Sequence, residues 1–275
     1  MDHPAGADHA LAWSRLGNLL RKQGRYPEAN AWFARALPLA EALHGPTAGP
    51  VRTILNNWAV LHKYQGRFAE GARLYRRALK AALAEGGEDQ AEVATLHHNL
   101  GGLEHARGRF AAGEPFARKS VAIRRRLLGA KHPDVAADAA ALAAILVGLK
   151  QYAEAERIYR RTLAVFRRAY GPAHYEVAVT LGNLAALLHQ TGRPRLAERY
   201  YRQALAQKER LLGAGHVELA VTLNNLAMLH QKQGQRAQAE VLCRRALGIF
   251  AAALPRRHPS VRQSRLNLGL IRQKG

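Results

Sequence analysis

The stretch Thr222-Leu-Asn-Asn-Leu-Ala-Met-Leu-His-Gln-Lys-Gln-Gly234, followed by Gln235-Arg-Ala-Gln-Ala-Glu-Val-Leu-Cys-Arg-Arg-Ala-Leu247, reads as two amphipathic helices joined at a glycine. The same unit recurs along the whole chain at steps of 42 residues, or twice that where one turn lacks its glycine. A sustained period of this length is typical of a helical repeat array. The turn positions are Gly24, Gly66, Gly108, Gly192 and Gly234, with Lys150 in the place of the missing glycine.

Composition limits the class of protein further. The chain has 275 residues, 48% hydrophobic residues but only 7% aromatic ones, and one cysteine, Cys243. It therefore cannot form an intrachain disulfide, which fits a reducing compartment. Neither a signal peptide nor an apolar run long enough to span a bilayer is visible, so the sequence predicts a cytoplasmic protein. The formal net charge of +22 predicts an acidic partner.

The apolar positions and the glycines predict the helices. First helices are expected to begin near Ala10, Arg52, Ala94, Ala136, Ala178, Ala220 and Arg262, and second helices near Tyr26, Phe68, Phe110, Tyr152, Pro194 and Arg236. Second helices should end at glycines, and at Pro255 in the last unit. The predicted organisation is a lead-in over residues 1–9 and a single array over 10–275, with repeats at 10–51, 52–93, 94–135, 136–177, 178–219 and 220–261 and a terminal helix at 262–275.

Each second helix carries two small residues seven positions apart, such as Ala197 and Ala204. The residue four positions after the first is aromatic in four of the six helices, as at Tyr201, and is Ala117 or Cys243 in the other two. This pattern resembles the tetratricopeptide repeat. The length of 42 residues and the Leu-Asn-Asn-Leu-Ala motif at 223–227 resemble its kinesin-light-chain subtype. The resemblance implies an all-α, right-handed α-solenoid of helix-turn-helix units. HEAT and armadillo repeats are the alternative fold, but they do not predict an aromatic at that position.

The resemblance also implies that the first helices line a concave groove. Five asparagines recur in register there: Asn57, Asn99, Asn183, Asn225 and Asn267. An asparagine side chain offers both a donor and an acceptor, so the column can bind the backbone of an extended peptide. The alternative is a structural ladder between neighbouring helices. Basic and polar residues beside the column predict a peptide with acidic residues: Lys63, His105, His189 and Lys232.

A second column is basic and lies on the second helices, opposite their buried face. It contains Arg76, Arg77, Arg118, Arg160, Arg161, Arg202, Arg244 and Arg245. Four of these arginines follow a glutamate by four residues, which is the favourable order for a helix ion pair. The column is therefore either a solvated outer face or, as an alternative function, a site for nucleic acid or an anionic surface. Nucleic acid is the weaker alternative, because no aromatic residues alternate with the charges.

The sequence shows no pattern typical of an enzyme: no glycine-rich phosphate loop, paired-acid site or nucleophile motif. The recurring histidines His132, His174, His216 and His258 lie 42 residues apart, which suits a packed loop residue rather than shared metal ligands. Cys243 takes a core position and is predicted to be inert. The interpretation is a non-catalytic interaction scaffold without cofactor or metal. The first unit carries Trp13, Leu20 and Trp32 with no helix before it, so self-association through this end is also predicted.

Overall fold

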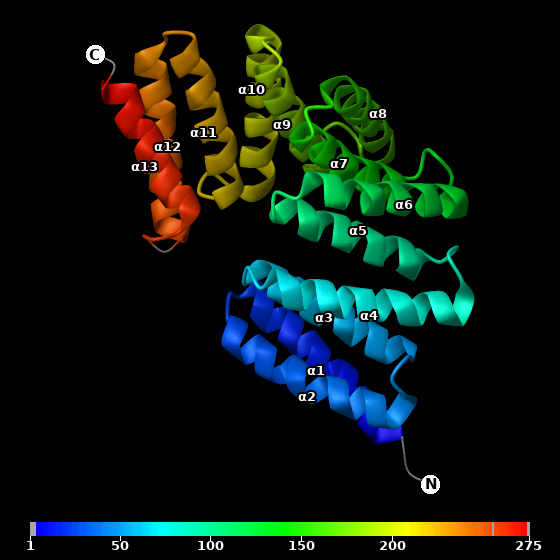
Figure 1. The fold of residues 1–275 in the computed structure, drawn as a ribbon. Coiled ribbons are helices and arrows are strands. Elements are labelled where there is room, and N and C mark those ends of the chain that lie inside the picture. The colour runs from blue at the N-terminus through cyan, green and yellow to red at the C-terminus, as the bar shows by residue number, and fades with distance from the viewer. Residues whose placement is uncertain (1–3, 255, 274–275) are drawn as a thin grey trace. The chain divides into compact units, whose positions relative to one another are not determined.

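The computed structural model describes residues 4–254 and 256–273, with side chains described from residue 9 onward. All thirteen elements found in these ranges are α-helices, which confirms the all-α solenoid class (Figure 1). The helices are α1 (Pro4–Lys22), α2 (Tyr26–His44), α3 (Gly49–Tyr64), α4 (Phe68–Gly86), α5 (Ala91–Ala106), α6 (Phe110–Leu128), α7 (Pro133–Gly148), α8 (Tyr152–Tyr170), α9 (Tyr175–Gln190), α10 (Pro194–Leu212), α11 (Val217–Lys232), α12 (Arg236–Ala253) and α13 (Pro259–Gln273).

The helices divide into two compact units, Met1–Gln151 and Tyr152–Gly275. Within unit 1, α1 packs on α2, α3 on α4 and α5 on α6, and within unit 2, α9 packs on α10 and α11 on α12. Each second helix also contacts the next first helix of its unit, and successive first helices contact one another. Helical pairs stacked only on their neighbours are the arrangement of a solenoid.

Glycines in the left-handed region make the turns. Gly24, Gly66, Gly108, Gly192 and Gly234 all have φ between 70° and 78°, as the repeat pattern predicts. Lys150 adopts the same conformation at φ 61° and is the only non-glycine residue of the described chain with positive φ. Because a side chain clashes with the backbone there, the fourth turn carries strain that the glycine turns avoid.

The second helices begin where the pattern predicts, but the first helices begin earlier. Those after α1 begin about one turn before the predicted residues, for example at Pro133 instead of Ala136. The expected lead-in is also shorter, because α1 is helical from Pro4 and residues 1–3 lie outside the described chain. The apolar pattern begins only at the first buried residue, and it does not report the exposed first turn. Pro255, the expected stop of α12, lies outside the described residues.

Histidines cap four of the first helices. In His132, His174, His216 and His258 the Nδ1 atom accepts a hydrogen bond from the backbone N–H two residues on, at 3.1–3.3 Å. Such a cap satisfies one of the N–H groups that a helix start leaves without a partner. The recurring histidines therefore have a structural role as helix caps, and none of the four is buried, unlike the packed loop residues that the sequence predicted.

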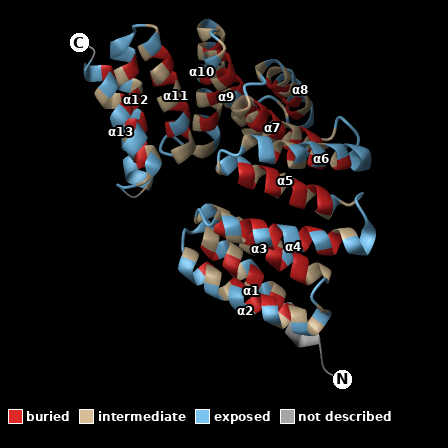
Figure 2. Ribbon diagram, viewed as in Figure 1, coloured by how far each residue is buried: buried red, intermediate tan, exposed pale blue. Residues whose placement is uncertain are grey.

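The buried residues of each unit lie where paired helices face each other (Figure 2). The core of unit 1 is continuous from Ala10 to Ile123, and unit 2 has separate clusters around Leu223 and around Ala227. Leu20, expected at an open end, is buried in the unit 1 core. Trp13 and Trp32 are half-buried, with ring centroids 6.0 Å apart and the Arg35 guanidinium over both. Self-association through this end stays a prediction.

A polar cluster interrupts the core between α5, α6 and α7. The buried Asp138 carboxylate accepts hydrogen bonds from Ser120 Oγ and, at 2.8 Å, from Arg124 Nε. His98 Nδ1 lies 2.9 Å from the other carboxylate oxygen. Arg124 also donates to Thr95 Oγ1 at 3.1 Å, so one carboxylate joins three helices.

Candidate functional site

The asparagine column forms part of a ladder between first helices. Asn99 Nδ2 donates to Asn56 Oδ1 at 2.8 Å, and Asn267 Nδ2 donates to Asn224 Oδ1 at 3.0 Å. Asn57 Nδ2 makes the equivalent bond, at 3.3 Å, to Ser14 Oγ. In each case the acceptor belongs to the residue 43 positions earlier, in the preceding first helix. These three asparagines therefore form the structural ladder between neighbouring helices that was the alternative to peptide binding.

The other two members of the column, Asn183 and Asn225, are open, which means that their side-chain amides have no hydrogen-bond partner in the described chain. The residue 43 positions before Asn225 is Gly182, and the one before Asn183 is Ala140, so neither can supply a side-chain acceptor. Asn183 is exposed and Asn225 is half-buried, and within the described chain neither side chain makes a hydrogen bond. Their amides keep both a donor and an acceptor for another molecule.

In unit 1 a lysine and a histidine of the predicted site come close together. The Lys63 ammonium lies over Gly102 of α5, so that a Cβ atom placed there would be 3.2 Å from Nζ. Burial lowers the pKa of Lys63, and burial together with the Lys63 charge lowers the pKa of His105. His105 is thereby favoured as a neutral side chain beside a cation, an arrangement that a bound carboxylate would stabilise.

Unit 2 repeats this pairing inside a cavity. His189 and Lys232 line a space of about 590 Å³ together with Met228, Gln231, Gly234, Arg236 and Ile271. Burial, and to a lesser extent the Lys232 charge, lowers the pKa of His189. The sequence predicted His189 and Lys232 as site residues but missed Arg236. Arg236 is the first residue of a second helix, and the predicted site contained only positions on first helices.

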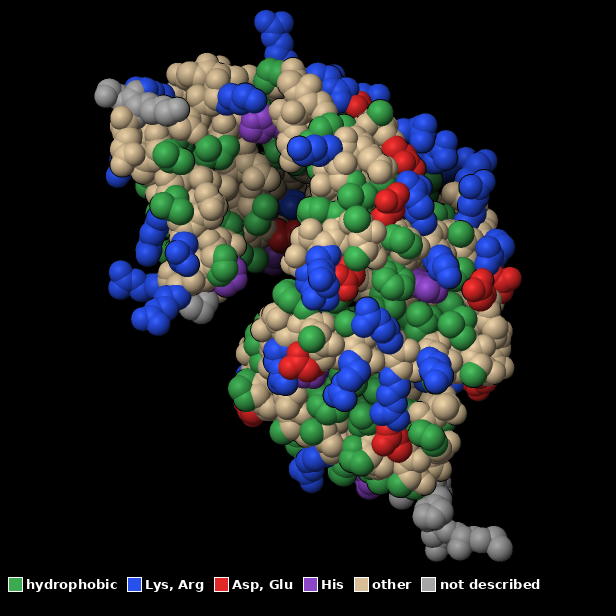
Figure 3. Space-filling model, in the orientation of Figure 1, with side chains coloured by type: hydrophobic (Ala, Val, Ile, Leu, Met, Phe, Trp, Pro, Cys, Tyr) green, Lys and Arg blue, Asp and Glu red, His purple; other side chains and the backbone are tan. Residues whose placement is uncertain are grey.

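The basic column of the second helices is exposed, as predicted, but most of its charge is compensated. The four glutamate–arginine pairs expected at a spacing of four form at 2.7–2.8 Å, at Arg118, Arg160, Arg202 and Arg244. Arg77 pairs with Glu41 and Arg245 with Glu209 across neighbouring second helices. On the face in Figure 3, Lys and Arg outnumber Asp and Glu, which lie among them. Of the eight arginines, Arg76 and Arg161 have no ion pair within the described residues.

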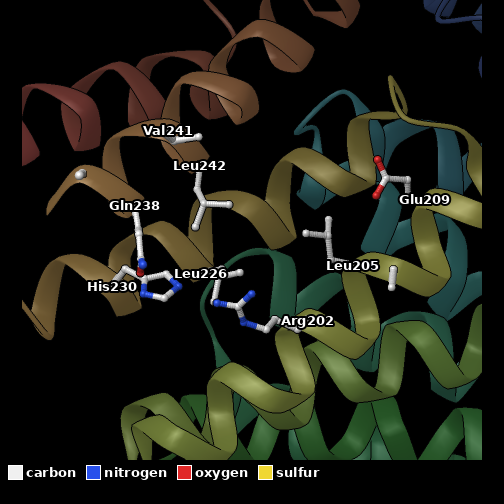
Figure 4. A pocket seen from close by; sticks show the side chains of 10 residues that line it. Arg202, Leu205, Glu209, Leu226, His230, Gln238, Val241 and Leu242 are labelled. Carbon is white, nitrogen blue, oxygen red and sulfur yellow. The ribbon is translucent and has the colours of Figure 1, made fainter. Parts of the chain in front are cut away.

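A groove lies between the second helices α10 and α12, above α11 (Figure 4). It has a volume of about 620 Å³, with Leu205, Leu226 and Leu242 among its lining residues. Val241 at its edge is 68% exposed. In the two preceding repeats, the same position holds Arg199 and Arg157. Arg202 and Glu209 in its lining are each already paired, so the groove has little net charge to offer.

A reactive cysteine, a metal site and a membrane-spanning helix are not found in the described chain. The Cys243 thiol is buried, which raises its pKa and disfavours the thiolate. Within these residues, no group of three or more metal-binding side chains could hold an ion. The described helices include none that is both long and apolar enough to cross a membrane.

Models of a known protein family match most of the chain. One model of the tetratricopeptide repeat matches residues 8–84, 50–112 and 136–210, and a second model of this repeat matches 93–134 and 219–260. No curated protein matches the chain.

Among solved structures, BtubC (BKLC) from P. vanneervenii is 23% identical over 92% of this chain and 96% of its own, with a TM-score of 0.61. A candidate kinesin light chain from Podosopora anserina, with nearly identical TPR-like repeats, is 20% identical over 72% of this chain and 94% of its own, with a TM-score of 0.60. A Rap protein complexed with competence and sporulation factor is 14% identical over 97% and 75%, with a TM-score of 0.62. At these identities the likeness concerns the fold.

Proposed function

Because the chain belongs to the tetratricopeptide repeat family, we propose that it is a protein–protein interaction scaffold that binds an extended peptide carrying acidic residues along its first helices. Proteins of this family are generally non-catalytic scaffolds. The observation that carries the proposal is the pair of open amides, Asn183 and Asn225, in a column whose other members bond internally. Asn225 is half-buried, so its amide needs water or a ligand as a partner, and the exposed Asn183 amide is accessible to either.

The preference for acidic residues rests on the lysine–histidine pairs. Lys63 with His105, and Lys232 with His189, each place a cation beside a histidine on neighbouring first helices of one unit. A carboxylate bound between them would form charge-assisted hydrogen bonds with both side chains. An anion-binding function of the second-helix arginines is less favoured, because six of the eight already have carboxylate partners.

Substitution of the open asparagines should weaken peptide binding. We expect Asn183→Ala and Asn225→Ala each to cost about 0.5–1.5 kcal/mol of binding free energy, because each removes one donor and one acceptor. Calorimetric titration with acidic peptides selected from a short-peptide library would measure the loss. Asn99→Ala is the matched control: its amide is already bonded to Asn56, so it should lower the melting temperature more than the affinity. Equal effects of Asn225→Ala and Asn99→Ala on affinity and stability would refute the proposal.

Binding should also depend on pH. The pKa values of His105 and His189 lie below the ordinary histidine value in the free protein, and a bound carboxylate would raise them. Affinity should therefore increase as the pH falls from about 7.5 toward 5.5, and decrease again when peptide carboxylates become protonated near pH 4. His189→Gln should flatten this dependence, whereas replacing the exposed His44 by Gln should leave it unchanged. Affinity that is constant over this range would contradict a role for the histidines.

A further inference from the structure

The outward face of α13 has exposed leucines where a helix usually carries polar groups. Leu266 is 61% and Leu270 47% exposed, and their spacing of four places them on one side of the helix. With Arg262, Arg265 and Gly269, among others, they line a shallow cavity of about 390 Å³. In Figure 3 hydrophobic side chains lie beside Lys and Arg on the surface of α12 and α13. The terminal helix is therefore amphipathic rather than the polar cap that its arginines suggest.

The repeat register shows what usually covers this face. The positions of Arg262 and Arg265 are those of Ala220 and Leu223 in α11. Both of those residues are fully buried, in a cluster with Ala246, Ile249 and Phe250 of α12. In the preceding pair, this face is thus covered by a second helix. None of the described helices takes that place on α13.

Gly269 supports this interpretation independently. It holds the small-residue position at which first and second helices approach most closely. A Cβ atom at Gly17 would lie 3.0 Å from the Phe33 ring, and one at Gly101 would lie 3.2 Å from the Ala117 backbone nitrogen. At Gly269 a Cβ atom would meet nothing within 4 Å. The position at which a second helix approaches α11 most closely is therefore open on α13 within the described chain.

The charges on the face indicate the chemistry of the occupant. Arg262 and Arg265 are exposed, and within the described chain no carboxylate forms an ion pair with either of them. Arg272, in contrast, pairs with Glu240 at 2.8 Å. Two uncompensated guanidinium groups beside two exposed leucines are complementary to an apolar stripe bordered by carboxylates.

We propose that this face of α13 binds an acidic amphipathic helix of a different protein, in the place that a second helix takes on α11. The occupant would set a small residue or a leucine against Gly269, pack apolar side chains on Leu266 and Leu270, and pair carboxylates with Arg262 and Arg265. A second copy of this chain is disfavoured. Each copy carries a net charge of +22, and a symmetric contact would bring the same arginines together.

The test uses a fluorescently labelled synthetic peptide of helical periodicity, with leucine at every third or fourth position and glutamate elsewhere, and its lysine counterpart. Fluorescence anisotropy with the full chain should show binding of the glutamate peptide and at least tenfold weaker binding of the lysine peptide. Gly269→Leu places a large side chain where the bound helix would approach α13 most closely, and it should weaken binding at least tenfold. Gly248→Leu is the matched control, because Gly248 is also helical with open space around it, and it should bind as the unchanged protein does.

Charge reversal provides a second, independent arm. The double variant Arg262→Glu and Arg265→Glu should exchange the preference between the two peptides, while thermal melts confirm that it folds. Equal binding by Gly269→Leu and the unchanged protein would overturn the proposal. So would loss of this peptide in Asn183→Ala or Asn225→Ala, because the peptide would then lie on the first-helix column. A dimer in light scattering that the charge reversal dissociates would also overturn it, in favour of a second copy.

Discussion

Asp138→Ala is expected to lower the free energy of unfolding of unit 1 by about 3–5 kcal/mol, the range for removing one partner of a buried ion pair. Burial alone would raise the pKa of Asp138, but hydrogen bonds from His98, Ser120 and Arg124 outweigh it and bring the pKa below the ordinary value. The ionised carboxylate is therefore the stabilising form. Its removal leaves the half-buried Arg124 guanidinium without its charge partner and three helices without their common acceptor.

Denaturant unfolding would measure this change, and amide hydrogen exchange should locate it in α5, α6 and α7. Asp134→Ala is the control on the same helix, because the Asp134 side chain is 58% exposed and should contribute less than about 1 kcal/mol. The lowered pKa also fixes the sign of the pH dependence. The contribution of Asp138 is present above the unfolded-state value of about 3.9 and is lost as the pH falls through the folded-state value. An Asp138→Ala variant as stable as the unchanged chain would show that the cluster does not hold unit 1 together.

Tyr201→Ala is expected to destabilise unit 2 by about 3–5 kcal/mol, because it removes a large aromatic side chain from the core and leaves a cavity. Tyr201 is fully buried in α10, and this burial raises the pKa of its hydroxyl. In the equivalent position of α2, the Phe33 ring lies against Gly17, so the aromatic fills the space that the small residue of the first helix leaves.

The same repeat position supplies the control for this experiment. Cys243 of α12 is equally buried but small, so Cys243→Ala should cost far less than Tyr201→Ala. Tyr201→Phe retains the ring and should fall within about 1.5 kcal/mol of the unchanged protein. Chemical denaturation followed by circular dichroism would compare the three. Similar losses for Tyr201→Ala and Cys243→Ala would mean that the aromatic is not what stabilises the helix pair.

The fold was predictable because the features that specify it are local and repeated. A glycine at φ 70–78° lies in five of the six turns between first and second helices, and apolar residues three and four apart mark the buried face. The pattern also located the second helices, since their first residue follows the turn directly. It misplaced the starts of the first helices because histidine caps and exposed first turns, as at His132, lie outside the apolar pattern.

The candidate site was less predictable, because its properties depend on pairs of residues from different helices. The sequence shows five asparagines in register, but only the neighbour 43 positions earlier determines whether an amide is occupied. Asn56 and Asn224 occupy two of them, and Gly182 cannot occupy a third. The cavity around His189 likewise includes Arg236, which no periodic pattern connects with the first helices. The ion pairs of the basic column could be predicted only where glutamate and arginine share a helix.

The asparagine ladder has a consequence for protein engineering. A consensus array built from identical copies of residues 220–261 would carry Asn-Asn at 224–225 in every copy. Each asparagine of the column would then donate to the copy before it, as Asn267 donates to Asn224. Such an array would have one interhelical hydrogen bond of this kind at every junction between copies. No asparagine at these junctions would then keep a free amide for a bound peptide. In this chain the departures from the average repeat, Gly182 above all, are what an engineer would have to preserve.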